Sequence, residues 1–373
     1  MRSIERIALF LAGLLVCAAA VPAAAQSGQL GAGVSFERYG FGDAASTGIE
    51  SLTLLTLPFG GRTMLARDFS LELSGAYASG RLVRADGGES KLSGLTDTNL
   101  RATFALADQR VVLGATFSAP TGHATQSVEE SEVAGAIAAD LLPFRITNWG
   151  SGGGVSADAS FVSSLGGTNV GLNVGYGIAR EFEPLADDER AYLPGNQLLV
   201  RLAFDRNVTS SGKMTLILAM QRFGSDELSG ANLYRSGNRF QSMLSYAFAA
   251  GSQSSAVLYG GWNRRQRGTF LDASLLGTGD ETPAQDLILA GGGFRMPLGS
   301  GAILPRADVR VFRSNDGVGQ GYTFGLGAGT ETELGGLTLL PVLHARFGNV
   351  LVREGQESGF TGITASMTVR FGR

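Results

Sequence analysis

The sequence predicts an all-β protein, namely a transmembrane antiparallel up-and-down β-barrel of about sixteen strands, with about fourteen as the alternative. Three observations support this fold class. Apolar and polar residues alternate with period two in many segments, and the N-terminus has the features of a secretory signal. In addition, no later segment stays apolar for the ~18 residues that a spanning helix needs.

The N-terminal segment has the pattern of a signal peptide. Arg2 and Arg6 precede the apolar run Ile7–Val16, and Ala23–Ala25 form a small-residue cleavage site. We therefore expect residues 1–25 to be removed on export.

The remaining residues, 26–373, are expected to form one barrel domain. Cys17 is the single cysteine and leaves with the signal peptide, so the mature chain has no disulfide although it enters an oxidising compartment. The alternatives are a membrane anchor and a lipoprotein acylated at Cys17. Both are disfavoured, because the apolar run is short and Val16 stands where a small residue is expected.

Composition narrows the class of protein. The net charge is −3 and the isoelectric point is near 5.6, which excludes a basic nucleic-acid-binding protein, so no nucleic-acid partner is expected. Glycine accounts for 55 of 373 residues without a three-residue period, which excludes collagen. Charged residues are only 17% and the mean hydropathy is +0.11, so the chain is moderately apolar nearly everywhere.

Alternation with period two runs through the mature chain. It is found in Phe69–Tyr77, Leu100–Leu106, Val170–Ile178, Leu198–Phe204, Met214–Met220, Phe240–Phe248, Ala307–Val311 and Ile363–Phe371. Strands of roughly 9–13 residues with one apolar face match what crosses a bilayer when tilted. A barrel with lipid outside and water inside explains them, and it is expected in the outer membrane of a bacterial cell. A secreted β-sandwich or solenoid is the main alternative.

The connections alternate between short and long, as in outer-membrane barrels with periplasmic turns and external loops. The short ones are Asp108–Gln109, Leu165–Gly167, Thr209–Gly212, Gly251–Ser252, Leu298–Gly301 and Leu334–Gly336. The long ones lie near residues 40–48, 81–93, 121–150, 182–195, 224–237, 265–284, 314–320 and 348–359. Both termini should be periplasmic, which demands an even number of strands. The first strand is expected near Gly31, which leaves no room for a plug domain in the mature chain.

The connection 121–150 is ambiguous. Its segment Val133–Phe144 does not alternate, and apolar residues recur in it at helical spacing, which predicts a short helix within an external loop. For a loop that folds into the lumen, the candidate constriction residues are Val133, Ile137, Asp140, Leu141 and Phe144. A protruding loop or an irregular strand is the open alternative.

Charged residues on the polar faces of the strands are candidates for tuning the selectivity of a lumen. These residues are Arg101, Arg201, Asp205, Arg306, Asp308, Arg310 and Arg346. Salt bridges that only neutralise the interior are an equally good reading.

Little in the sequence indicates catalysis. Of the two histidines, His344 is expected to be a structural residue near Arg346 and His123 a solvated loop residue; neither is placed with a serine and an orienting group as a hydrolase requires. The acidic clusters Glu129–Glu132 and Asp187–Glu189 could bind calcium but are expected to be solvated loops. We expect no enzyme, no cofactor and no metal site.

Four short motifs carry a family resemblance. They are Thr56–Gly60 (TLPFG), Asp68–Leu73 (DFSLEL), Gly94–Thr98 (GLTDT) and Pro120–Gly122 (PTG). The segment 50–122 that contains them, about a fifth of the chain, resembles outer-membrane proteins of the phenol meta-pathway type, which are similar to the long-chain fatty-acid transporters. The resemblance implies passage of small hydrophobic molecules. The fatty-acid transporters have an N-terminal plug, for which this chain has no room.

The sequence therefore favours an outer-membrane channel or transporter that passes small molecules passively, hydrophobic ones if the resemblance holds. The alternative is a non-transport barrel with a structural or surface-binding role. Expected partners are outer-membrane lipid, a small solute or hydrophobic ligand, and the barrel-assembly machinery. That machinery reads an aromatic residue on the last strand, here Phe371.

Overall fold

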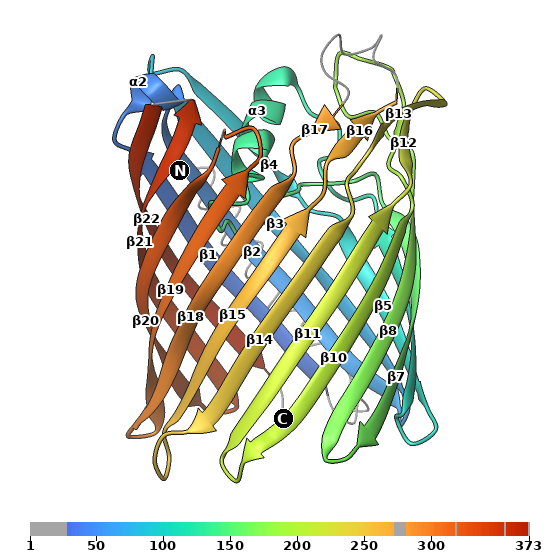
Figure 1. Cartoon of the computed structure of the whole chain (residues 1–373), viewed down its shortest axis with the longest axis vertical. Helices are drawn as coiled ribbons and strands as arrows, with labels where there is room; N and C mark the ends of the chain where they lie inside the picture. Colours follow the sequence, from blue (N-terminus) through green and yellow to red (C-terminus); the bar gives the residue numbers. More distant parts are fainter. Residues whose placement is uncertain (1–27, 272–280, 318, 354–355, 372–373) are drawn as a thin grey trace.

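The computed structural model describes residues 28–271, 281–317, 319–353 and 356–371 and confirms the closed antiparallel barrel of sixteen strands (Figure 1). The expected signal peptide lies outside the described residues. The barrel strands are β1 (Gly28–Phe41), β2 (Ile49–Ala66), β3 (Phe69–Arg84), β5 (Thr98–Leu106), β6 (Val111–Ala119), β7 (Gly154–Leu165), β8 (Thr168–Ala179), β10 (Gln197–Thr209), β11 (Gly212–Phe223), β14 (Arg239–Ala249), β15 (Ser255–Arg265), β18 (Gln285–Leu298), β19 (Gly301–Ser314), β20 (Gly321–Leu334), β21 (Leu337–Arg353) and β22 (Gln356–Phe371).

The first and last strands close the ring. β1 pairs with β2 on one side and with β22 on the other, with Leu30 opposite Phe371. One position in the ring is shared, because β3 pairs with β5 through its first half and with β4 (Glu89–Leu95) through its second half. Thr96 and Asp97 lie at the break between these two short strands. Within the described residues the ring of sixteen barrel strands is closed, which is the condition for spanning a membrane with strands.

Short turns join the strands at one end and longer segments at the other, as the sequence predicted (Figure 1). Two of the turns are Gly166–Gly167 and Gly335–Gly336, and all four glycines have positive φ angles, between 55° and 90°. A two-residue hairpin that requires positive φ at both positions selects glycine. Periplasmic turns of this kind place the long segments on the external side of the membrane.

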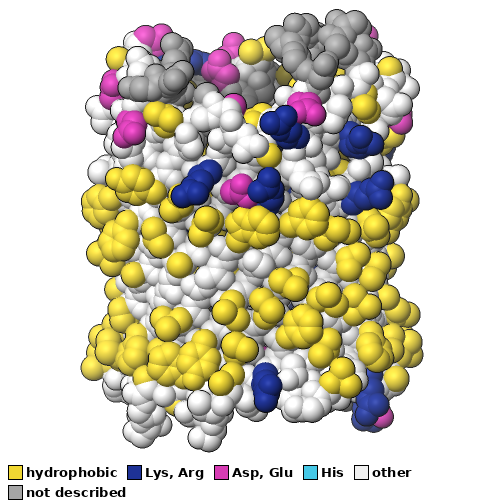
Figure 2. Space-filling view, in the orientation of Figure 1, with side chains coloured by type: hydrophobic (Ala, Val, Ile, Leu, Met, Phe, Trp, Pro, Cys, Tyr) yellow, Lys and Arg dark blue, Asp and Glu magenta, His cyan; other side chains and the backbone are white. Residues whose placement is uncertain are grey.

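The outer surface of the barrel is apolar. Figure 2 shows a broad band of hydrophobic side chains around the wall, with Lys and Arg above and below it. Large side chains such as Phe117, Leu258 and Leu343 are more than half exposed there, whereas inward Ser35 and Thr56 are buried. A soluble sandwich would bury its apolar faces instead. The exposed band therefore identifies the faces that contact lipid, and the secreted sandwich is excluded.

Several long segments contain more strand than the sequence indicated. The connection expected at 348–359 is mostly an extension of β21 and β22, and that at 81–93 is mostly an extension of β3 together with β4. The barrel strands consequently reach 18 residues in β2, beyond the expected length. The β-ladder continues through these extensions, where the sequence no longer shows alternating apolar residues.

A second sheet lies at the external end. It has the order β17 (Glu281–Thr282), β16 (Gly268–Phe270), β13 (Ala231–Arg235), β12 (Ser225–Leu228) and β9 (Tyr192–Leu193). The buried carboxylate of Asp226 accepts hydrogen bonds from the Tyr192 hydroxyl at 2.6 Å and the Gly195 N–H at 2.7 Å, which fixes β9 to β12. The sequence did not predict this sheet.

Helices are few in the described part of the chain. α2 (Ala44–Thr47) is a single turn capped by Asp43, and α3 (Val128–Ile137) lies in the connection between β6 and β7. None of the described helices is long and apolar enough to cross a membrane.

Candidate functional site

Residues 120–153 connect β6 to β7, and this inserted loop packs against the inner wall of the barrel. Its helix, α3, contacts β3 and β4 near the external end (Figure 1). The Ser127 hydroxyl accepts a hydrogen bond from the Glu130 N–H at 3.3 Å, and the Glu130 carboxylate accepts one from the Ser127 N–H at 3.0 Å. This reciprocal capping fixes where the helix begins.

The predicted helix in this loop is correct in kind and wrong in position. The expected segment was Val133–Phe144, whereas the helix starts at Val128 and ends at Ile137. The capping residue Ser127 lies upstream of Val133–Phe144, and Pro143 has no N–H with which to continue a helix. Leu141 and Phe144 therefore contact the wall from the irregular segment that follows α3.

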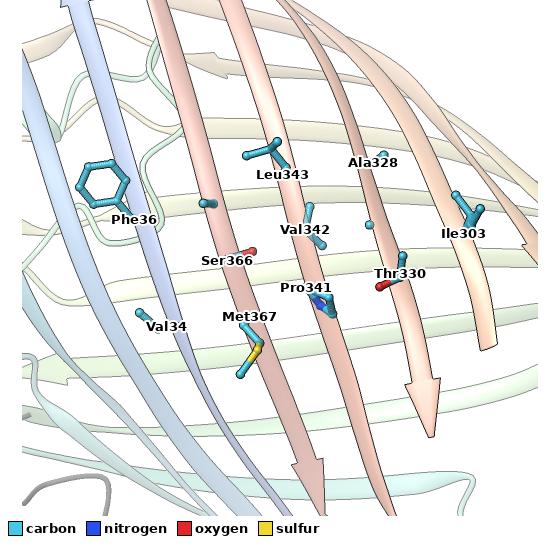
Figure 3. Close-up of a pocket in the computed structure, with 12 residues that line it drawn as sticks. Val34, Phe36, Ile303, Ala328, Thr330, Pro341, Val342, Leu343, Ser366 and Met367 are labelled. Atoms are coloured by element: carbon cyan, nitrogen blue, oxygen red, sulfur yellow. The ribbon is translucent and has the colours of Figure 1, made fainter. Parts of the chain in front are cut away.

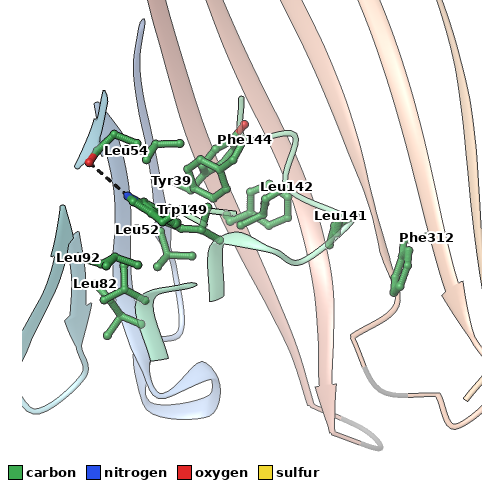
Figure 4. Close-up of a cluster of buried hydrophobic side chains, with 14 residues drawn as sticks. Tyr39, Leu52, Leu54, Leu82, Leu92, Leu141, Leu142, Phe144, Trp149 and Phe312 are labelled. Carbon is green, nitrogen blue, oxygen red and sulfur yellow. Dashed lines mark hydrogen bonds between the residues drawn. The ribbon is translucent and has the colours of Figure 1, made fainter. Parts of the chain in front are cut away.

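An apolar cluster joins the inserted loop to the wall (Figure 4). Its members are Tyr39, Leu52, Leu54, Ala78, Leu82, Leu92, Val133, Ile137, Leu141, Leu142, Phe144, Trp149, Phe312 and Phe360. Val133, Ile137 and Trp149 are 0% exposed. Full burial of a side chain of this size contributes about 1.5–3 kcal/mol, so the cluster stabilises the packed position of the loop.

The contact surface depends on small residues in the wall. A Cβ atom at Gly80 of β3 would lie 2.9 Å from Ile137 Cδ1, 2.9 Å from Val133 Cγ1 and 3.2 Å from Trp149 Cζ2. The absence of a side chain at Gly80 therefore gives α3 and Trp149 the space to pack directly on the strand.

Polar contacts fix both ends of the inserted loop and its middle. The carboxylate of Asp97, at the break between β4 and β5, accepts hydrogen bonds from the Gly122 N–H at 3.1 Å and the Ser151 N–H at 2.8 Å. The buried carboxylate of Glu37 on β1 accepts one from the Arg145 N–H at 3.0 Å. The loop is thus anchored at its base and along its length.

Charged groups on the external side add two contacts. Arg84 of β3 pairs with Glu132 of α3. His123 Nε2 lies 3.2 Å from Glu130 Oε2, so His123 contacts the capping residue of α3 and is not the simple solvated residue that was expected. The acidic cluster Glu129–Glu132 thus caps the helix and pairs with Arg84. No group of three or more acidic, histidine or cysteine side chains suited to a metal occurs in the described residues.

The inserted loop extends away from the wall that anchors it. Leu141 points towards Phe312 of β19 in Figure 4, and both belong to the same cluster. Asp140, which directly precedes Leu141, lies close enough to Arg239 of β14 for its negative charge to act on the Arg239 guanidinium. β14 stands eight strand positions from β2 in the sixteen-strand ring, so Asp140 faces the wall opposite the anchor.

A charged cluster lines the wall formed by β19 to β21. Arg346 donates to both carboxylate oxygens of Asp308, at 2.8 and 3.2 Å, and its Nη2 lies 3.0 Å from His344 Nδ1. Asp308, Gly325 and Arg346 are in register across three strands. Gly325 has no side chain between Asp308 and Arg346, which lets the two side chains meet. A Cβ at this position would lie 2.8 Å from His344 Cε1.

The other candidate lumen residues divide into paired and unpaired groups. Arg101 pairs with Asp158 at 2.7 Å, and Asp205 pairs with Lys213 at 2.7 Å. Arg306 and Arg310 lie with Tyr259 around a hollow of about 160 Å³ beside Asp308 and Arg346. Arg201 lies on the same face of β10 as Asp205 but makes no ion pair among the described residues. Roles in selectivity for these residues remain a prediction.

A shallow hollow also occurs on the outer face (Figure 3). Val34, Phe36, Leu343 and Met367 surround it, and small residues such as Ala365 form its floor. These side chains belong to the exposed faces of β1, β21 and β22. The hollow therefore faces lipid and lies apart from the lumen.

Sixteen closed antiparallel strands, an apolar outer band and a polar inner wall define a bacterial outer-membrane β-barrel. No protein-family model and no curated protein matches the sequence.

Solved structures are similar in fold. The COG4313 outer membrane channel from Pseudomonas putida F1 is 16% identical over 76% of this chain and 95% of that chain, with a TM-score of 0.38. Pseudomonas putida OprB at low pH is 10% identical over 93% of both chains, with a TM-score of 0.46. A triple mutant of Rhodopseudomonas blastica porin is 12% identical over 92% and 99%, with a TM-score of 0.39. At such identities the similarity concerns the fold alone.

Sequence reasoning missed the residues that hold the inserted loop. Glu37 and Tyr39 stand at inward positions of β1, where their burial depends on a loop more than 100 residues away. Asp97 belongs to the GLTDT motif, which does not indicate in the sequence that its carboxylate binds the loop. One signal was present: Leu52 and Leu54 are apolar on the face of β2 that should be polar, which marks a wall covered by something other than water.

Proposed function

We propose that the protein is a passive outer-membrane channel for small solutes and that the inserted loop narrows its passage. The observation that carries the proposal is the apolar cluster, which fixes the loop to the inner wall at β1 to β4. A barrel of sixteen strands is wide enough for an aqueous lumen, so the loop occupies part of a space that would otherwise be open. Val133, Ile137, Leu141 and Phe144 would act by holding it, and Asp140 by presenting a charge.

The lining supports polar rather than hydrophobic solutes. Charged side chains of β19 and β21 face the lumen, and the loop covers the apolar inward residues of β1 to β4. The resemblance to the phenol-pathway proteins implies hydrophobic solutes, and a route for them would need an exposed apolar inner surface. We therefore favour water-soluble molecules.

Reconstitution tests the channel directly. Purified protein is refolded in detergent, checked for a heat-dependent shift in gel mobility, and added to a planar lipid bilayer. Discrete conductance steps and leakage of small sugars from liposomes are expected. A folded, membrane-inserted protein that shows neither result would contradict the proposal.

A surface-binding barrel is the second candidate. The observation in its favour is the external sheet of β9, β12, β13, β16 and β17, which extends beyond what a membrane wall requires. Removing the β12–β13 hairpin (residues 225–235) should leave conductance unchanged if the sheet serves an external partner. The same deletion would alter conductance if the sheet belongs to the channel mouth.

A further inference from the structure

A hollow of about 790 Å³ lies on the inner wall between β22, β1, β2 and β3. Gly31 and Gly60 are in register with each other in its floor and have no side chains to fill the space. Arg370 on β22 and Ser74 on β3 continue the same row on either side. The hollow is therefore built into the register of the strands.

Three arginines line this hollow, and each comes from a different segment. Arg62 belongs to β2, Arg145 to the inserted loop and Arg370 to β22, while Glu72 of β3 is the single acidic residue among the described residues that line the hollow. Within the described residues, none of the three guanidinium groups has a carboxylate oxygen within 4.0 Å. Glu72 is opposite Arg62 in the register and still makes no such pair.

Several other cations of the inner wall do have a carboxylate partner, although Arg201, Arg306 and Arg310 do not among the described residues. Arg101 and Lys213 each have a carboxylate at 2.7 Å, and Arg346 has one at 2.8 Å. Among the described residues, Arg62 donates only to the Ser70 hydroxyl, at 3.2 Å. Among the lining side chains, three positive charges stand against one negative charge, and the region stays net positive when Glu37 beside Arg145 is included, so it attracts anions.

We propose that this hollow, the arginine subsite (Arg62, Arg145 and Arg370), binds small organic anions that carry carboxylate groups. Guanidinium groups bind carboxylate and phosphate through two parallel hydrogen bonds, and the hydroxyls of Ser74 and Thr368 supply further donors. β22 and β2 both pair with β1, where Arg370 is opposite Gly31 and Arg62 is opposite Gln29, so the two backbones are about 12 Å apart. That spacing suits a dicarboxylate whose two ends each meet one arginine.

This inference rests on the proposed channel, because the subsite would select the solutes that reach the constriction from the periplasmic side. Binding is nevertheless measurable without conduction. Calorimetry on the detergent-purified protein uses succinate, inorganic phosphate and sucrose as probes. Planar bilayers in a potassium chloride gradient then report the ion selectivity through the reversal potential.

The wild type should bind succinate more tightly than phosphate, should not bind sucrose, and should select anions. Arg62→Gln and Arg370→Gln should each weaken succinate binding by about tenfold, the effect of losing one charged hydrogen-bonding group. Arg38→Gln is the matched control, because Arg38 lies on the outward face of β1 and should leave binding unchanged. Equal binding by phosphate would reassign the subsite to single anionic groups and overturn the dicarboxylate assignment.

The two proposals fail in different ways. If succinate binding depends on Arg62 and Arg370 but the protein does not conduct, the channel proposal is contradicted and the subsite proposal is supported. If the protein conducts but selects cations, or if neither substitution changes succinate binding, the subsite proposal is contradicted and the channel proposal is supported. A heat-dependent mobility shift verifies that each variant is folded. If a variant does not fold, the anion or cation selectivity of the wild-type protein tests the subsite instead.

Discussion

The indole Nε1 of Trp149 donates a hydrogen bond of 3.2 Å to the carbonyl oxygen of Ala78 on β3 (Figure 4). Both residues are 0% exposed. Trp149 belongs to the inserted loop and Ala78 to the barrel wall, so this bond and the packing around it attach the loop to the wall.

Trp149→Ala should release the end of the inserted loop. Loss of a buried tryptophan costs about 3–5 kcal/mol, much of which here is the packing of the loop on the wall. We expect noisier and larger single-channel currents in planar bilayers. Trp262→Ala is the control, since Trp262 is 39% exposed on the outer face. Equal currents in wild type and Trp149→Ala would show that Trp149 does not hold the loop.

Gly80→Val tests the same contact from the wall. The added side chain would meet Val133 and Ile137 at 2.9 Å, and overpacking of this kind costs about 1–3 kcal/mol. The loop should be displaced and accessible to protease in the folded barrel, with larger conductance. Gly40→Val is the matched control, because a Cβ at Gly40 has no neighbour within 4 Å. A loop that stays protected in Gly80→Val would contradict the packing described.

Gly325→Ala should destabilise the wall rather than the loop. A methyl group there would lie 2.8 Å from His344 Cε1 and 2.9 Å from Asp308 Oδ1, so the Asp308–Arg346 pair would have to shift. We expect a loss of about 1–3 kcal/mol in the free energy of unfolding, measured by denaturant titration in detergent micelles. The comparison is Gly293→Ala, where the nearest atom is 3.5 Å away. An equal stability of the two variants would mean that the pair tolerates a residue beneath it.

The external sheet should respond to alkaline pH. Burial and the hydrogen bond to Asp226 raise the pKa of Tyr192 above its ordinary value of 10.0. A raised pKa stabilises the folded form below pH 10, and this contribution is lost as the pH rises above 10 towards the folded pKa. Protease sensitivity of the β9 region should therefore increase above pH 10 in the wild type and less steeply in Tyr192→Phe. Parallel profiles would contradict the role of this hydroxyl.

The alternating faces of the strands could be predicted because lipid imposes one rule on every strand. Ile363 and Met367 face outward on β22, as their place in the sequence required, and they are 44% and 43% exposed. The strand number followed from the same rule and from the turns. Each of these features depends on residues near one another in the chain, so the sequence alone can predict them.

The inserted loop and the external sheet could not be read in the same way. Glu37 and Arg145 meet across 108 positions of sequence, and nothing local to either residue indicates the contact. The strands of the external sheet have two to five residues, too few to show a period. The arginine subsite was missed because Arg62 and Arg370 become neighbours only when β22 closes on β1.

The measurement that tests the channel most directly is the conductance of a variant without the inserted helix. The His123 N–H donates to the Trp149 carbonyl oxygen at 3.0 Å, so a short Gly-Ser linker can replace residues 124–148 without distorting the wall. The proposed function predicts a folded barrel with clearly larger single-channel conductance than the wild type. Unchanged conductance in a correctly folded variant would contradict the claim that this loop sets the width of the passage.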